Sequence, residues 1–428
     1  MTNLLLAFSV MLLLAVLVSN LAHRTVLSTA ALFLVGGFLL GDGVTGLVSL
    51  QPGEPIVSEL SELALFAVLF TDGMHAGWQD LRSAWRLPGR ALGWGLPLTL
   101  LLTAVFARYV VGLDWVESLL IAAVLTPTDP VFAAALVGND KVPPRLRHLL
   151  NVESGVNDGL VLPFVVLFLA LAKGSGDLHL GELGGELAAG VAIGVAIPWA
   201  AIALERTRLF AISPKYEPLN ATAIGLLVLA VAQATHGNLF LAAFAAGVTV
   251  ASLGERSRES FAEFGELVAE LLKLAALLVF GALLSPAFLG DVGWTGWAFA
   301  VLALVVARPA AIWVSFLRSR LTAREQGAMM WFGPKGFASV VYGLLVLESG
   351  ITEGDHIFHL VGVTIALSIL AHSSTDIVVA RGFDEEREVP AWFGTVRTLG
   401  RRHQDEDDDP PEPGGDDPPP DPAPDRPR

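Results

Sequence analysis

Long runs of apolar residues, each ended by polar or charged residues, recur along the first 380 residues of the chain. A helix needs about 20 mainly apolar residues to cross a bilayer core roughly 30 Å thick. Thirteen segments meet this requirement: 3–22, 25–41, 57–75, 90–112, 115–137, 145–172, 185–204, 219–236, 238–253, 261–285, 293–316, 323–348 and 354–380. The pattern therefore predicts an all-α polytopic membrane protein with about 13 transmembrane helices.

The basic residues of the connecting loops are divided unequally between the two sides of the predicted membrane. One set of alternate loops holds 15 Lys and Arg residues, whereas the opposite set holds Lys173 alone. Short loops rich in Lys and Arg remain in the cytoplasm. We therefore expect the N-terminus outside and the C-terminus in the cytoplasm. No basic residue precedes the apolar run 4–21, so we expect a retained span there and not a cleaved signal peptide.

Composition supports a chain whose solvent is mostly lipid. Hydrophobic residues make up 53% and charged residues 16%, whereas a soluble domain carries about 25% charged residues. The formal net charge of −15 argues against a nucleic-acid partner. The absence of Cys excludes disulfides, thiolate metal sites and Cys nucleophiles, and the nine His residues show no metal-ligand spacing. We expect a cell-membrane protein with lipid around it, no cofactor and no enzymatic activity.

The last part of the chain, 381–428, differs from everything before it. Residues 405–409 form an acidic run, and Pro, Asp and Gly dominate 410–428. Such a segment cannot bury enough apolar surface to offset the entropy of ordering it. We expect a disordered cytoplasmic tail that acts as a solvating segment, while a regulatory role or an unknown partner stays open.

Three predicted spans are interrupted by polar residues near their centres. They read Leu-Thr-Pro-Thr-Asp-Pro-Val over 125–131, Asn-Val-Glu-Ser-Gly-Val-Asn-Asp-Gly over 151–159, and Trp-Phe-Gly-Pro-Lys-Gly-Phe over 331–337. A charged residue at a helix centre costs roughly 2.5–3.5 kcal/mol on insertion scales, so intramembrane charges are candidates for function.

Their depths agree. Asp129, Asp158 and Lys335 lie 14, 13 and 12 residues into their spans, which is roughly 18–21 Å along each helix and close to the bilayer midplane. Proline before and after Thr128-Asp129, and the sequence Gly-Pro-Lys-Gly, both disfavour continuous helix. Non-helical backbone at this depth has to be buried in protein or line a cavity. The sequence therefore predicts broken helices 5 and 12, crossing at the midplane.

The numbering of the two broken helices suggests an internal repeat. If the helix numbers are shifted by seven, helices 1–6 correspond to helices 8–13. Because seven is odd, corresponding helices run in opposite directions through the membrane. Paired broken helices in inverted repeats with a midplane site are typical of secondary transporters. We expect two inverted six-helix repeats, although residue-by-residue self-similarity is not evident.

The sixth span carries a polar face. Glu153 and Asn157 are four residues apart, as are Ser154 and Asp158, so together they form one broad stripe directed at the fifth helix. Carboxylate, hydroxyl and carbonyl oxygens suit a small alkali cation, and the same carboxylates can bind protons because burial disfavours their charged form. A site that accepts either a cation or a proton gives obligatory exchange.

These residues resemble the NhaP-type sodium–proton antiporters of the monovalent cation:proton antiporter superfamily over about residues 1–380. Thr128-Asp129-Pro130 is similar to the unwound-helix motif of the family, and Glu153-Ser154-x-x-Asn157-Asp158 to its ion-site signature. Phe70-Thr71-Asp72-Gly73 resembles the acidic segment that ends the third helix, and Gly333-Pro334-Lys335-Gly336 lies where the family has Gly-x-Arg-Gly.

The resemblance implies roles for individual residues. Asp158 is the main carboxylate for cation and proton, with Asp129 nearby and Asn157 in the signature beside it. The Thr128 backbone, Ser154 and Asp72 complete the ion shell or its cytoplasmic funnel, and Glu153 pairs with Lys335. The resemblance also implies a homodimer that works as an elevator. Helices 1–3 and 7–10 form its scaffold for dimerisation, and helices 4–6 and 11–13 form its mobile core.

Several alternatives remain open at this stage. Asp129 and Asp158 could be structural carboxylates held by helix N-termini, Glu153 with Lys335 could be a structural ion pair, and Asp72 could be a vestibule charge. Lys335 in place of Arg and the shorter Asp72 affect ion selectivity more than antiport. For three more intramembrane charges we expect structural pairing or snorkelling: Arg308, Lys273 and Asp376. His148 could sense pH or be an ordinary interfacial residue.

Other functions are also consistent with part of the pattern. An intramembrane aspartyl protease would carry two buried Asp residues, but Asp158 lacks the Gly-x-Gly-Asp setting. A cation channel would be built on symmetric rings. Within antiporters, potassium–proton exchange is the main alternative to sodium or lithium exchange. Because Asn157 cannot titrate, we expect electroneutral exchange of one cation for one proton.

Overall fold

The structure is a computed structural model that describes residues 2–22, 28–51, 53–76, 86–129, 142–174, 180–207, 210 and 212–383. The chain divides into two units, 1–381 and 382–428, and the helices discussed here belong to the first. From residue 384 onward the predicted tail lies outside the described residues, as does 130–141, the second part of the predicted fifth span.

The first half of the chain consists of helices separated by short connections. Their bounds are α1 Thr2–Ala22, α2 Thr29–Leu40, α3 Pro55–His75, α5 Arg86–Arg90, α6 Leu96–Phe106, α7 Trp115–Leu125, α9 Pro144–Ala172 and α10 Leu180–Glu205. The π-helical turns Ala91–Gly95 and Ala107–Val111 continue α5 and α6 into a single helical segment over 86–111.

The second half of the chain also consists of helices with short connections. After a 3₁₀ turn at Pro214–Tyr216 come α11 Glu217–Thr235, α12 Leu239–Leu253, α13 Glu255–Leu283, α14 Pro286–Asp291, α15 Gly293–Leu302, α16 Arg308–Ser315, α17 Ala323–Trp331, α18 Phe337–Glu348 and α19 Gly354–Gly382. A π-helical turn, Ala303–Ala307, joins α15 to α16. In the described part of the chain, extended pairing is limited to an isolated bridge between Gly41 and Val48. The predicted all-α class is therefore confirmed, whereas the number of spans and the inverted repeat stay predictions.

Length and composition mark several of these helices as membrane-spanning. Within the described residues, five are long and apolar enough to cross a membrane: 86–111, 144–172, 181–205, 293–315 and 354–382. Shorter apolar helices include α2, α7, α11, α12 and α18. Many large apolar side chains on these helices are exposed, as expected for a surface that faces lipid.

Helix starts follow local rules that can be traced to single residues. Asp114 and Glu117 form a reciprocal capping box at the start of α7, and Thr322 and Glu325 form another at the start of α17. Each box satisfies backbone N–H groups that have no partner in the first helical turn. Both boxes lie on the helices that lead into the two predicted breaks, so they fix where those helices begin.

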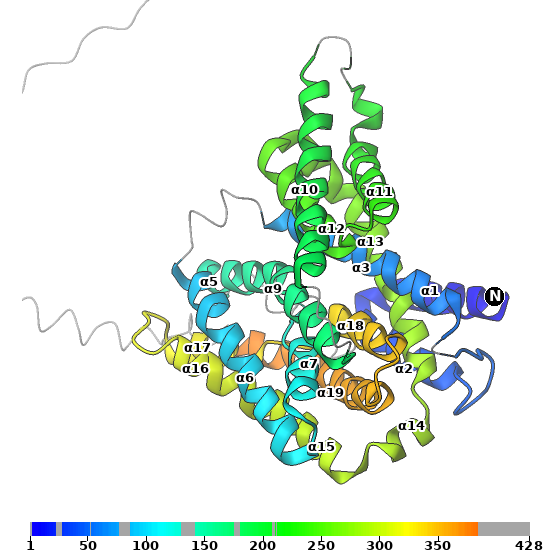
Figure 1. The fold of residues 1–428 in the computed structure, drawn as a ribbon, viewed down its shortest axis with the longest axis vertical. Helices are drawn as coiled ribbons and strands as arrows, with labels where there is room; N and C mark the ends of the chain where they lie inside the picture. The colour runs from blue at the N-terminus through cyan, green and yellow to red at the C-terminus, as the bar shows by residue number, and fades with distance from the viewer. Residues whose placement is uncertain are drawn as a thin grey trace, which may run out of the picture. The chain divides into compact units, whose positions relative to one another are not determined.

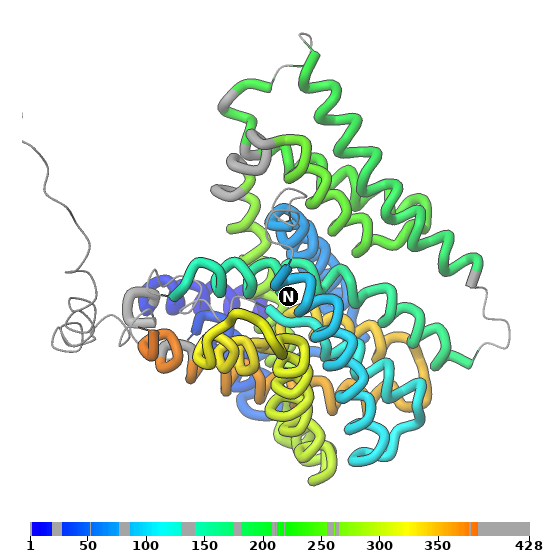
Figure 2. Tube along the Cα trace, turned by 90° about the vertical axis from the view of Figure 1, so that its left-hand side faces the viewer, coloured from blue at the N-terminus to red at the C-terminus, as the bar shows by residue number. Residues whose placement is uncertain are grey.

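The helices of the first unit pack in two groups. The helices α3, α10, α11, α12 and α13 pack on one another, with α2 against α13. The helices α6, α7, α9, α15, α16 and α17 form the second group. Figures 1 and 2 show the green helices of the first group on one side of this unit and the cyan and yellow helices of the second group on the other. The two groups are joined at two places. The helices α3 and α12 contact α9, and α18, which packs on α7 and α9, also contacts α3 and α13.

The twelfth predicted span is interrupted as expected. The helix α17 ends at Trp331, residues 332–336 are not helical, and α18 begins at Phe337. The helix α7 ends at Leu125, and residues 126–129 leave the helical conformation just before Pro130. The two interruptions meet, because the backbone N–H of Asp129 donates a hydrogen bond of 3.0 Å to the carbonyl of Pro334.

The close packing of α3 against α12 depends on two glycines. A Cβ atom on Gly247 would lie 2.1 Å from the carbonyl oxygen of Phe70, and one on Gly73 would lie 2.4 Å from that of Phe244. The atoms in the way belong to the opposite backbone, which cannot move aside as a flexible side chain can. Small residues at such crossings let helices approach closely in membranes. Because Gly73 follows Asp72, this contact also fixes the position of that carboxylate.

We therefore expect Gly247→Val to destabilise the protein by at least the roughly 1–3 kcal/mol typical of overpacking. The measurement is the melting temperature of the purified protein in detergent. Gly184→Val is the matched control, because it makes the same change in a helix where an added Cβ meets no atom within 4 Å. Equal melting temperatures for the two variants would contradict the close approach of α3 and α12.

Candidate functional site

The crossing of the two interruptions satisfies backbone groups that a continuous helix would have paired. Besides the bond from Asp129 to Pro334, the N–H of Phe337 lies 3.5 Å from Oδ2 of Asp129. The N–H of Lys335 donates to Oγ of Ser368 at 2.7 Å. Buried peptide groups need such partners, so the crossing depends on side chains from three parts of the chain. It holds the Asp129 carboxylate at the N-terminus of α18, where the helix dipole favours negative charge.

Two glycines of the Gly-Pro-Lys-Gly segment make room for charged side chains. A Cβ atom on Gly336 would lie 2.0 Å from the Cβ of Asp129, and one on Gly333 would lie 1.5 Å from Nε of Arg308. Neither position could hold a larger residue without displacing the charged neighbour. The segment is therefore shaped by the groups that it packs against as well as by its helix-breaking proline.

The fifth and sixth predicted spans are joined by a buried network of neutral polar side chains. Nδ2 of Asn157 donates to Oγ1 of Thr128 at 2.6 Å, and the N–H of Thr128 lies 3.4 Å from Oδ1 of Asn157. The hydroxyls of Thr128 and Ser154 are 3.2 Å apart. The polar face of α9 is thus directed at the fifth span, as expected for Ser154 and Asn157. Both the acceptor and the donor group of the Asn157 amide are engaged.

Asp158 is buried on the same face of α9, with 4% of its surface exposed. Its Oδ1 atom has no hydrogen-bond partner among the described residues. Its backbone carbonyl accepts a 3.0 Å hydrogen bond from the hydroxyl of Tyr342, a fully buried residue of α18. A buried carboxylate oxygen without a partner is costly, so this atom marks a place where a cation or a proton would be stabilised.

Asp72 brings a third carboxylate to the same region from α3. It is partly exposed, and its charge interacts with those of Asp129 and Asp158. The helices are close at this point, because a Cβ atom on Gly155 of α9 would lie 3.5 Å from the carbonyl oxygen of Asp72. We call Asp72, Asp129 and Asp158 the carboxylate cluster. Asp72 lies on α3, Asp158 lies on α9, and Asp129 lies in the non-helical segment that follows α7.

The partner of Glu153 differs from the prediction. Nη1 of Arg308 lies 2.8 Å from Oε1 of Glu153, and Nη2 lies 3.1 Å from Oε2, so the pair is bidentate. Nη2 also donates to the carbonyl of Phe332 at 3.0 Å. Glu153 and Arg308 are both buried, with 4% exposure each. The predicted Glu153–Lys335 ion pair is therefore wrong, and Arg308 takes the place of the lysine.

The chemistry of the two basic side chains explains this choice. The planar guanidinium presents parallel donors to both carboxylate oxygens, and a spare donor remains for a free carbonyl at the end of α17. Lys335 points elsewhere, with its ammonium 3.5 Å from the carbonyl of Thr126 at the end of α7. The ammonium thus faces the unpaired carbonyl end of a broken helix, where positive charge is favoured.

The other intramembrane charges are paired where the structure describes them. Arg308 is held by Glu153, and Nζ of Lys273 lies 2.6 Å from Oε2 of Glu270, so the expected structural pairing is confirmed for both. The side chain of Asp376 lies outside the described residues. Nothing in the local sequence indicated that Arg308 would contact Glu153, because the two residues are 155 positions apart.

The ligands gathered here suit a monovalent cation. Within the described ranges, no three His, Cys, Asp or Glu side chains come together as a metal-ion site. Oxygen donors nevertheless lie at the crossing: the Asp129 carboxylate, the hydroxyls of Thr128 and Ser154, and the carbonyl of Thr126. Hard oxygen ligands of this kind match alkali cations.

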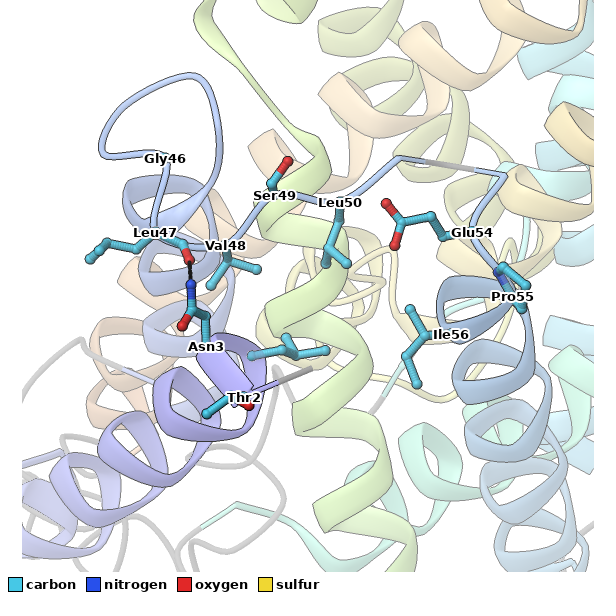
Figure 3. Close-up of a pocket in the computed structure, with 11 residues that line it drawn as sticks. Thr2, Asn3, Gly46, Leu47, Val48, Ser49, Leu50, Glu54, Pro55 and Ile56 are labelled. Atoms are coloured by element: carbon cyan, nitrogen blue, oxygen red, sulfur yellow. Dashed lines mark hydrogen bonds between the residues drawn. The ribbon is translucent and has the colours of Figure 1, made fainter.

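A separate cleft of about 530 Å³ lies away from the crossing. It is formed by the start of α1, the segment 46–50 and the start of α3 (Figure 3). Two hydrogen bonds hold its lining: Nδ2 of Asn3 donates to the carbonyl of Leu47, and Oε1 of Glu54 accepts from the N–H of Gln51. It contains none of the buried charged residues, so it is not the candidate ion site.

Comparisons with known proteins point in one direction. Residues 10–381 match the model of a family described as sodium/hydrogen exchanger, transmembrane. The K(+)/H(+) antiporter NhaP2 of Shewanella sp. (strain MR-4) is 24% identical over 376 residues, which are 86% of this chain and 64% of that protein. The K(+)/H(+) antiporter NhaP of Alkalimonas amylolytica is 25% identical over 399 residues, covering 92% of this chain and 69% of that protein. The chain thus spans slightly less than two thirds of the Shewanella relative.

A solved structure shares the fold. The sodium proton antiporter MjNhaP1 from Methanocaldococcus jannaschii superposes with a TM-score of 0.74, covering 88% of this chain and 96% of that chain. The sequence identity is 17%. At this identity the likeness shows the arrangement of the helices and says nothing of the ion that is carried.

The bidentate pair yields a prediction about stability. Arg308→Met leaves the Glu153 carboxylate buried and unpaired, so we expect a loss of roughly 3–5 kcal/mol. The double variant Arg308→Met with Glu153→Leu removes both charges and should be more stable than Arg308→Met alone. Melting temperatures in detergent measure both effects. Glu353→Gln, which breaks a pair with His356 whose side chains are each 39% exposed, is the control and should cost about 0–1 kcal/mol. If the double variant were no more stable than Arg308→Met, the pair would not be coupled.

Proposed function

The chain belongs to the transmembrane sodium/hydrogen exchanger family, and on that premise we propose that it exchanges a monovalent cation for a proton across a membrane. The observation that carries the proposal is Asp158, which is buried beside the two crossing helix breaks. One of its carboxylate oxygens has no hydrogen-bond partner in the described part of the chain. Glu153, the other acid of the motif, is already neutralised by Arg308. Asp158 is thus the acid on α9 that is left to bind an ion.

Exchange follows from competition at one carboxylate. Ionised Asp158 offers a negative oxygen to a cation, together with hydroxyl and carbonyl oxygens at the crossing. Protonated Asp158 has lost the charge that attracts the cation, so the proton and the cation exclude each other. A carrier that changes its facing only with one of the two bound couples their movements in opposite directions.

Sodium or lithium is the first candidate cation, and potassium is the second. The family model names sodium, whereas the curated relatives are named as potassium–proton antiporters. Lys335 presents a compact ammonium where a bidentate guanidinium is usual, and Asp72 is one methylene shorter than the usual Glu. Both changes alter the space and charge around the carboxylate cluster, so ion preference has to be measured directly.

We propose an elevator mechanism in a homodimer, with helices 1–3 and 7–10 of the predicted spans as scaffold. The packing of α3 with α10–α13, and of α6, α7 and α9 with α15–α17, supports a division of this kind. The crossing interruptions and Asp158 then belong to the mobile part. We further propose that the protein lies in the cell membrane, surrounded by lipid, with its N-terminus outside and its acidic tail in the cytoplasm.

The test of the proposed function is transport by the full chain in proteoliposomes. A proton gradient is imposed, and dequenching of a pH-sensitive dye is followed after adding sodium, lithium or potassium. Saturable dequenching with at least one of them supports antiport, and their relative apparent affinities identify the cation. Cation flux that proceeds without proton movement would instead indicate a channel.

Asp158→Asn should abolish exchange in this assay while the protein remains folded. Asparagine keeps the size of the side chain and an acceptor oxygen, but it cannot titrate or carry charge. Asp355→Asn makes the same chemical change at an exposed position in the first turn of α19 and should transport normally. Transport by Asp158→Asn at the rate of the unmodified protein would remove Asp158 from the mechanism.

Exchange should be electroneutral, one cation for one proton. The Asn157 amide is engaged with Thr128 and cannot exchange a proton, so Asp158 is the acid of this pair that changes occupancy. The rate and the equilibrium position should then be unchanged when valinomycin imposes a membrane potential on liposomes in a sodium gradient. A rate that follows the potential would require a second group to take up charge during the cycle.

A further inference from the structure

The break between α17 and α18 opens a helical hydrogen bond whose two groups both find partners on α19. In a continuous helix the carbonyl of Trp331 would accept from the N–H of Lys335, four residues later. Here the N–H of Lys335 donates to Oγ of Ser368 at 2.7 Å, and the carbonyl of Trp331 lies 2.9 Å from Nε2 of His372. Ser368 and His372 are one turn apart on α19, with exposed fractions of 0% and 2%. One face of α19 therefore satisfies both ends of the lost bond.

The hydrogen-bonding capacity of these groups links them in one chain. The carbonyl of Trp331, which also accepts from the N–H of Gly333 at 3.0 Å, cannot donate, so Nε2 of His372 carries the hydrogen between them. Oγ of Ser368 accepts from Lys335 and has its own hydrogen to donate to Nδ1 of His372, 3.2 Å away. We call this chain, from the carbonyl of Trp331 through His372 and Ser368 to the N–H of Lys335, the α19 bridge.

The α19 bridge needs a neutral imidazole. A second ring hydrogen, on Nδ1, could be directed at the carbonyl of Ser368, 2.7 Å away, but Nδ1 could then no longer accept from the hydroxyl. The ring would also become an additional buried positive charge near the basic side chains of Lys335 and Arg308. A buried charge without a partner is costly, so the neutral ring with its hydrogen on Nε2 fits this position.

Trp331 fixes the orientation of the imidazole. The centroids of its indole ring and the His372 ring are 5.0 Å apart, and the two planes are inclined by 32°. The indole Nε1–H donates to Oγ1 of Thr375 at 2.8 Å. The last residue of α17 is thus held to α19 through its side chain as well as through its carbonyl.

The non-helical segment 332–336 carries contacts of the candidate ion site. The carbonyl of Pro334 accepts from the N–H of Asp129 at 3.0 Å, and the ammonium of Lys335 lies 3.5 Å from the carbonyl of Thr126. A segment without helical hydrogen bonds has to be held in one conformation against the entropy of the free chain. The position of the Asp129 backbone therefore depends on the groups that hold this segment.

We propose that Ser368 and His372 are positioning residues for cation binding, because the α19 bridge holds segment 332–336 in the conformation that meets Asp129. This inference rests on the proposed exchange and deepens it. Neither residue has to touch the transported ion, since both act through the backbone of the break. Loss of the α19 bridge should therefore weaken binding of the cation and leave the movement of the loaded carrier unchanged.

The test measures the apparent KM and the maximal rate of exchange in proteoliposomes, titrated with NaCl, or with LiCl or KCl where either gives a larger signal. Ser368→Ala removes the hydroxyl, so we expect the apparent KM to rise about three- to tenfold, as for the loss of one hydrogen bond. The maximal rate should stay near that of the unmodified chain. Ser315→Ala is the matched control, because its buried hydroxyl donates within its own helix to the carbonyl of Ala311, and its KM should not change.

Two variants of His372 separate hydrogen bonding from charge and packing. His372→Gln keeps a donor and an acceptor on a neutral side chain, so its apparent KM should stay close to that of the unmodified chain. His372→Met fills a similar space without either group and should raise the KM as Ser368→Ala does. If His372→Gln bound the cation as weakly as His372→Met, the imidazole would act through its charge or shape, and the inference would be wrong.

A double variant tests whether the two residues act together. Ser368→Ala with His372→Met interrupts the same α19 bridge twice, so its KM should be no higher than that of the weaker single variant, whereas increases that multiply would overturn the inference. Because Ser368→Ala removes a single oxygen atom, it still decides where His372→Met does not fold. A lower maximal rate at unchanged KM in Ser368→Ala would show only a loss of folded protein and would contradict the positioning role. Failure of the unmodified chain to exchange any cation for protons would instead contradict the proposed function.

Discussion

Charge in a medium of low dielectric constant has to be matched nearby, and the arrangement around the helix crossing follows from this requirement. Removing one partner of a buried ion pair typically costs 3–5 kcal/mol. Glu153 is matched by Arg308 through both carboxylate oxygens, and Lys273 is matched by Glu270. Lys335 faces the carbonyl end of α7. After these matches, the Oδ1 atom of Asp158 is left without a hydrogen-bond partner among the residues that the structure describes. The site is therefore defined as much by the charges that are already neutralised as by the one that is not.

Buried backbone N–H and C=O groups also need partners nearby. Residues 332–336 and 126–129 give up helical hydrogen bonds, and the crossing replaces several of them with the bonds from Asp129 to Pro334 and from Lys335 to Ser368. Two carbonyls without a helical partner are satisfied by basic side chains. That of Thr126 accepts from Lys335, and that of Phe332 accepts from Arg308. The basic residues near the crossing thus neutralise acids and also complete the two broken helices. Glycine is required at two positions of this segment. A Cβ on Gly333 would displace Arg308, and a Cβ on Gly336 would displace Asp129.

Helix positions and breaks could be predicted because both depend on local sequence. An apolar run of sufficient length gives a span, and proline or glycine near its centre gives an interruption, as at 332–336. The partner of Glu153 could not be predicted this way. Arg308 follows the π-helical turn Ala303–Ala307, which changes the face that the next residues present, and neither the turn nor the packing of α16 leaves a clear sequence signal.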